Sequence, residues 1–147
     1  MPAGPAALFC DGLCSAAAQC GAPSDCETQC EGYRPGLVNL SDDGARHVGA
    51  CVARFDCFTL QDETAWKAGF DACWEQAKTE LTPRAPVRSF CAHYSEAWFE
   101  CDSWLSTSEC EAIYGMWSDA VLDRGAACDS SSCDALDQCV QATFDSL

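Results

Sequence analysis

The sequence predicts an all-α fold of two tandem disulfide-stapled repeats, each built from short helices and helical hairpins. Three observations lead to this prediction. Cysteine accounts for 14 of the 147 residues, the cysteine spacing of the first half returns in the second, and apolar residues recur at a helical rather than a strand period. They divide the chain into an N-terminal segment 1–8, a first repeat 9–79, a linker 80–89 and a second repeat 90–147.

The N-terminal segment is too short, and lacks the basic flank, to be an intact signal peptide. We therefore expect the mature form of an exported protein, with Met1 added for expression. Between the repeats, Pro83 and Pro86 interrupt any continuous helix and define the linker.

Within the repeats, apolar side chains cover one helix face in the stretches 66–81, 90–101 and 110–121. A capping role is expected near Ser41. Further helix starts are marked by a serine three residues before an acid. These pairs are Ser24 with Glu27, Ser108 with Glu111, and Ser131 with Asp134.

The number of cysteines predicts disulfides and export, because a reducing cytosol gives a chain little reason to keep so many thiols. We expect an extracellular, periplasmic or cell-surface protein in which every cysteine is paired. The cysteines are Cys10, Cys14, Cys20, Cys26, Cys30, Cys51, Cys57, Cys73, Cys91, Cys101, Cys110, Cys128, Cys133 and Cys139.

The duplication predicts one bridge. In the alignment, Cys14 and Cys30 stand opposite Ser95 and Tyr114, so two cysteines are missing together from the second repeat. A lone thiol invites mispairing, so they are most simply the two halves of one disulfide. We therefore predict a bridge between Cys14 and Cys30. For bridges across the hairpin turns, our choice among many pairings is Cys20 with Cys26 and Cys101 with Cys110.

Charge and hydropathy exclude several kinds of partner. The formal net charge is −15, which repels phosphate backbones and anionic lipid surfaces, so we expect no nucleic-acid binding. No apolar stretch is long enough for a transmembrane segment.

Metal binding is the main alternative explanation of the cysteines, as a Cu(I) or Zn(II) binding or storage protein. Zinc sites usually contain close cysteine pairs, yet no Cys-x-x-Cys occurs. Cys14 and Cys20 are spaced so that one continuous helix turns their thiols about 120° apart, which does not build a thiol-lined interior. We expect His47 and His93 to be surface or packing residues, and we expect no cofactor.

The sequence does not predict an enzyme. It contains no Gly-x-Ser-x-Gly, no His-Glu-x-x-His and no glycine loop for phosphate. Three apolar residues fall outside the helical stripes and are candidates for contact with an unknown protein or small-molecule partner, since exposed apolar clusters often mark binding surfaces. They are Phe99, Trp104 and Met116. Alternatively, Trp104 covers the turn between two helices.

Three local patterns resemble cysteine-rich helical modules in predicted exported proteins and lipoproteins of myxobacteria. They are the Cys-Glu-x-x-Cys at 26–30, the Cys-x5-Cys at 51–57 and the Phe-Asp-Ala-Cys at 70–73, and the resemblance extends over 9–144. It implies a bacterial source, export and disulfides, and no catalytic residues. We therefore expect a secreted helical binding module, with metal storage as the alternative.

Overall fold

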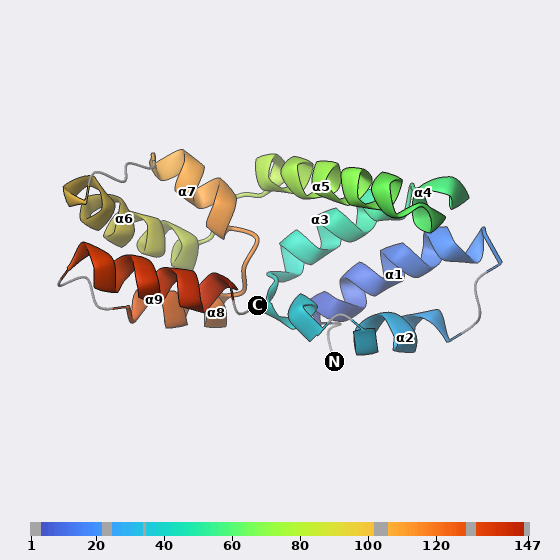
Figure 1. Cartoon of the computed structure of the whole chain (residues 1–147), viewed down its shortest axis with the longest axis horizontal. Coiled ribbons are helices and arrows are strands. Elements are labelled where there is room, and N and C mark those ends of the chain that lie inside the picture. Colours follow the sequence, from blue (N-terminus) through green and yellow to red (C-terminus); the bar gives the residue numbers. More distant parts are fainter. Residues whose placement is uncertain (1–3, 22–24, 34, 102–105, 129–131, 146–147) are drawn as a thin grey trace. The chain divides into compact units, whose positions relative to one another are not determined.

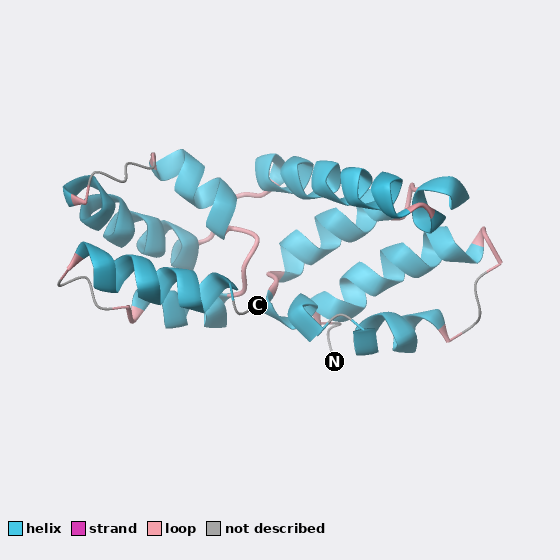
Figure 2. Ribbon diagram, in the orientation of Figure 1, coloured by secondary structure: helices cyan, strands magenta, loops and turns pink. Residues whose placement is uncertain are grey.

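The computed structural model describes residues 4–21, 25–33, 35–101, 106–128 and 132–145. This part of the chain contains nine α-helices and one short 3-10 helix, and no β-strand (Figure 1, Figure 2). The all-α prediction is therefore confirmed.

The chain divides into two compact units between Leu81 and Thr82. This boundary lies inside the expected linker 80–89, but helix α6 already begins at Ala85. Pro86 fits there because backbone N–H groups in the first turn of a helix have no partner within the helix. The second half of the expected linker is thus helical.

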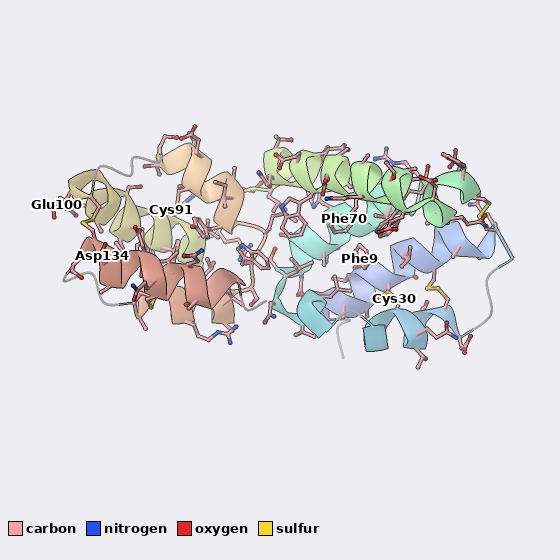
Figure 3. The ribbon with its side chains drawn as sticks, viewed as in Figure 1. Phe9, Cys30, Phe70, Cys91, Glu100 and Asp134 are labelled. Carbon is pink, nitrogen blue, oxygen red and sulfur yellow. A yellow bond between two sulfur atoms is a disulfide. The ribbon has the colours of Figure 1, made fainter. Side chains whose placement is uncertain are left out.

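The first unit contains six elements. These are α1 (Pro5–Ala18), α2 (Cys26–Tyr33), the 3-10 helix η1 (Pro35–Asn39), α3 (Asp42–Val52), α4 (Cys57–Gln61) and α5 (Glu63–Glu80). Helix α3 packs against both α1 and α5 (Figure 1). The backbones of α1 and α3 approach so closely that a Cβ atom on Gly12 would lie 2.1 Å from the carbonyl oxygen of Gly49. Phe9 and Phe70, labelled in Figure 3, meet edge to face with ring centroids 6.1 Å apart.

The second unit is formed by α6 (Ala85–Glu100), α7 (Thr107–Tyr114), α8 (Asp119–Ala126) and α9 (Cys133–Asp145). Helix α6 packs against α7 and α8, and α8 packs against α9. Phe90 and Tyr94 are buried side by side in the core, with ring centroids 4.5 Å apart. The Tyr94 hydroxyl donates a hydrogen bond to the carbonyl oxygen of Gly125, which satisfies this buried polar group.

Helix starts agree with the sequence in one case. The Ser41 hydroxyl accepts a hydrogen bond from the Gly44 N–H at 3.0 Å and caps α3, as expected. In α7, however, the capping box is formed by Ser106 and Glu109 rather than by Ser108 and Glu111. Ser106 precedes Glu109 by three residues, just as Ser108 precedes Glu111, so the sequence pattern does not distinguish the two serines. Of the remaining serines, Ser24 and Ser131 lie outside the described residues, and the Ser132 hydroxyl accepts from the Ala135 N–H near the start of α9.

The apolar stripe expected over 110–121 does not follow one helix. Helix α7 ends at Tyr114 and α8 begins at Asp119, so the helical register is interrupted between them. Ile113, which we placed on the core face, is 38% exposed. The interruption also explains the burial of Met116, described below.

Seven disulfides join all fourteen cysteines, and each lies within one unit. The pairs are Cys10 with Cys30, Cys14 with Cys26, Cys20 with Cys57, Cys51 with Cys73, Cys91 with Cys110, Cys101 with Cys133, and Cys128 with Cys139. No cysteine is free. The expectation of a disulfide-rich protein is confirmed, and the bridges fit an oxidising, extracellular environment.

The predicted bridge between Cys14 and Cys30 is wrong. Helices α1 and α2 form a hairpin in which the cysteines nearer the turn, Cys14 and Cys26, bond to each other. The outer cysteines, Cys10 and Cys30, bond in the same way. A crossed pairing would require the two helices to slide by a full turn.

The predicted bridges across the hairpin turns are also wrong. Cys20 lies just beyond the end of α1 and bonds Cys57, the first residue of α4. Cys101 lies beyond the end of α6 and bonds Cys133, the first residue of α9. Each bridge thus passes over the next two α-helices in the chain. The pairs Cys20 with Cys26 and Cys101 with Cys110 do not form.

The bridges follow a common order in the two units. In each, bridges join the first two helices, two of them in the first unit and one in the second. One further bridge in each unit runs from the end of the first helix to the start of a later helix. Cys110 therefore takes the place of Cys30, and the predicted alignment shifts. In the shifted alignment, Ser106 stands opposite Cys26. Tyr114 then has no cysteine opposite it. An internal duplication stays a prediction.

Candidate functional site

Of the three sequence-predicted partner residues, only Met116 has a side chain that the structure describes. Met116 is fully buried, with 0% exposure, so its assignment to the surface is wrong. The turn after α7 carries it inward, whereas a continuous helical register had placed it off the core. Phe99 lies on α6, but its side chain is outside the described part, as is the whole of Trp104.

The first unit contains an apolar hollow of about 390 Å³, which we call the Trp66 hollow. Most of its lining is apolar, and four helices supply it. The lining residues are Leu13 and Ala17 on α1, Cys26 on α2, Leu60 and Gln61 on α4, and Glu63 and Trp66 on α5. A volume of this size lies in the range of small-molecule sites, which are mostly apolar with a few polar groups.

Two disulfides hold the walls of this hollow in place. The bridge from Cys14 to Cys26 fixes α2 on α1. The bridge from Cys20 to Cys57 fixes the end of α1 on the start of α4. Because these helices cannot separate while the bridges are intact, the hollow is shaped before any ligand enters, which lowers the ordering cost of binding.

The Trp66 ring is held by two other aromatic rings. Phe70, one turn later on α5, stacks on it at 5.8 Å between ring centroids. Phe55 meets it edge to face at 5.7 Å. Phe55 in turn lies against Gly69, where a Cβ atom would come within 2.8 Å of its ring. Trp66 is therefore a rigid wall of the hollow, and such aromatic anchors bind at low entropic cost.

Carboxylates cap the two helices that carry Leu60 and Trp66. The Asp56 carboxylate accepts a 2.8 Å hydrogen bond from the Thr59 N–H, and this interaction together with the Thr59 hydroxyl lowers the pKa of Asp56. At the start of α5, the Asp62 carboxylate accepts from the Ala65 N–H at 2.9 Å. Both acids act as helix caps and therefore set where Leu60 on α4 lies.

A large apolar side chain is exposed on the same short helix. Phe58 on α4 is 69% exposed, two residues before Leu60 of the hollow. Single exposed apolar residues are common on protein surfaces. Phe58 differs because the segment that carries it also lines an apolar hollow.

A second hollow, in the other unit, is polar. It measures about 400 Å³ and lies between the end of α6 and the start of α9, near Glu100 (Figure 3). His93, Glu96 and Ser132 also line it. In the part of the chain that the structure describes, no three His, Cys, Asp or Glu residues are arranged to hold a metal ion.

The two histidines contact residues of their own units. The Nδ1 atom of His47 lies 2.8 Å from the Asp43 carbonyl oxygen, and its Nε2 atom lies 3.9 Å from the Glu80 carboxylate. The His93 ring meets the Tyr94 ring edge to face. They lie in different units, His47 in the first and His93 in the second.

Comparison with protein-family models, curated proteins and solved structures finds no match to this chain. The resemblance to myxobacterial exported modules therefore stays a prediction. Of the helices in the described residues, none is long and apolar enough to cross a bilayer.

Sequence reasoning missed the Trp66 hollow. We assigned Trp66 to a core stripe, although its side chain is only partly buried. Leu13 and Ala17 lie one turn apart on α1, and this spacing alone is typical of any packed helix face. The signal that was available is the short, strongly capped segment from Asp56 to Asp62, which ends one helix and starts the next.

Proposed function

We propose that the protein is an exported, disulfide-stabilised helical binding module, without catalytic activity, that takes a small apolar ligand into the Trp66 hollow. The supporting observation is a small-molecule-sized apolar hollow whose walls are fixed by two disulfides and whose aromatic wall is held by Phe55 and Phe70. The bridges preserve this shape outside the cell.

The metal-storage alternative has less support. Cu(I) and Zn(II) bind cysteine as the thiolate, and all fourteen cysteines are in disulfides. The oxidised protein thus has no thiol ligand to offer.

The test fills the hollow without disturbing its surroundings. Ala17 lines the hollow, whereas its neighbour Ala18 is exposed and does not. Ala17→Leu and Ala18→Leu are matched additions of the same side chain to the same helix. The probe is the neutral compound phenylpropanol, followed by ¹H–¹⁵N NMR with the Trp66 indole signal assigned from Trp66→Phe.

In the parent protein and Ala18→Leu, we expect the probe to shift the Trp66 indole and the amides of α1 and α4. Ala17→Leu is expected to weaken binding by about tenfold or more, since filled space removes the contacts of several methylene groups. Shifts that are absent, or that are the same in both variants, would contradict a ligand site in the hollow.

A further inference from the structure

The charge at the Trp66 hollow restricts what can bind there. Among the described residues that line it, Glu63 is the only one with an acidic or basic side chain. Glu63 is exposed and stands in the first turn of α5. The carboxylate is therefore at the rim of an apolar hollow, next to a rigid indole.

Among the described residues, no basic side chain forms a salt bridge with this carboxylate. Lys67 follows one turn later on α5, but it is not within salt-bridge distance of Glu63. The salt bridges of α3 and α5 use other acids, with Arg46 bound to Asp43 and Lys78 bound to Glu75. Residues 1–81 hold twelve acidic and five basic residues, so the surrounding field is also negative.

We infer that the ligand of the hollow is a small organic cation, an amine with an apolar body. This inference rests on the proposed function. The apolar part contacts Leu13, Leu60 and Trp66, and the ammonium group lies at the rim near the Glu63 carboxylate. An apolar acid of the same shape meets like charge there and is disfavoured.

The experiment compares three probes that share one apolar body: phenylpropylamine, phenylpropanol and phenylpropionate. Dissociation constants are measured by NMR titration at low salt. We expect the amine to bind about threefold to fivefold more tightly than the alcohol, which corresponds to an exposed ion pair, and the carboxylate to bind most weakly. Added salt is expected to reduce these differences.

Two variants assign the preference to Glu63. Glu63→Gln removes the rim charge, and the amine and alcohol should then bind equally. Asp71→Asn makes the same charge change on α5 away from the hollow and should keep the preference.

The outcomes separate this inference from the proposed function. If the three probes bind the parent protein equally at the hollow, the site stands and the cation inference is overturned. The inference is also overturned if Asp71→Asn abolishes the preference as fully as Glu63→Gln, because net charge alone would then explain it. If no probe shifts Trp66, the proposed function fails.

Discussion

Single glycines set the distance between helices in the first unit. Gly12 on α1 faces the Gly49 carbonyl on α3. Gly49 in turn faces the Leu8 carbonyl, and a Cβ atom on Gly49 would lie 2.8 Å from that oxygen. Glycine is needed here for close approach and not for an unusual φ angle. In the second unit, α6 and α8 are instead linked by the hydrogen bond from Tyr94 to Gly125.

Gly12→Ala is therefore expected to lower the free energy of unfolding by about 3 kcal/mol, because backbone atoms cannot move aside for the methyl group. The matched control is Gly32→Ala on α2, where a Cβ atom meets nothing within 4 Å. This control should change stability by less than about 1 kcal/mol, in the stabilising direction. Urea denaturation of the oxidised proteins measures both, and equal effects would refute the close-approach explanation.

The buried Tyr94 and the partly buried Tyr114 make the second unit sensitive to alkali. Burial raises the pKa of Tyr94, and burial together with the nearby Tyr94 raises the pKa of Tyr114. The folded state favours the neutral phenol. Its contribution to stability is full below the unfolded pKa of about 10 and is lost as the pH rises through the raised folded pKa.

We therefore expect the free energy of unfolding to fall above about pH 10, measured by denaturation at a series of pH values. Tyr94→Phe should be less stable by about 1 kcal/mol at neutral pH, because its hydrogen bond is lost, and its alkaline decline should be shallower. An alkaline decline as steep as that of the parent protein would show that Tyr94 does not contribute to it.

At the scale of elements, the helices were largely predictable and the bridges were not. Periodicity and capping serines predicted helices because both act locally along the chain, as Ser41 does for α3. A disulfide depends instead on which helix ends meet in space. Nothing local in the sequence shows that Cys20 reaches Cys57 past α2, η1 and α3.

The Trp66 hollow was also missed because it depends on which helices meet in space. Its walls come from α1, α2, α4 and α5, and each wall contributes only one or two side chains. No single helix carries a pattern that distinguishes these residues from core residues. The prediction that Met116 is exposed was wrong for the opposite reason, because the helical pattern was extended across the turn between α7 and α8.

The bridge order of the two units predicts a site for an eighth disulfide. Ser95 and Ser106 stand where the first unit has Cys14 and Cys26. They lie four residues inside the bridge from Cys91 to Cys110, as Cys14 and Cys26 lie four residues inside the bridge from Cys10 to Cys30. The Ser95 hydroxyl oxygen is buried and, among the described atoms, has no hydrogen-bond partner. Replacing it should therefore lose little.

The double variant Ser95→Cys with Ser106→Cys is expected to form this bridge. A loop of this length contributes about 3 kcal/mol, and loss of the Ser106 cap costs about 1 kcal/mol, so a net gain of about 2 kcal/mol follows. Intact mass and denaturation measure the outcome, with each single variant as control. Two freely alkylated thiols in a folded protein would count against the correspondence between the units.

At the scale of the whole molecule, seven bridges stabilise the fold, and none of them joins one unit to the other. Each unit has an even number of cysteines and its own buried core. The proposed binding function depends on this framework, because two bridges define the walls of the Trp66 hollow. Sequence predicted the disulfide scaffold, since cysteine content alone indicates it.

The most direct test is non-reducing tryptic mapping after alkylation of the native protein. Cleavage after Arg46, Arg54, Lys67 and Lys78 places Cys51, Cys57 and Cys73 on three separate fragments and leaves the other five cysteines of the first unit together in fragment 1–46. Fragment 47–54 should be joined only to 68–78, through Cys51 and Cys73, and 1–46 only to 55–67, through Cys20 and Cys57. Alkylated cysteines, or any of these fragments joined to 89–124 or 125–147, would contradict the account.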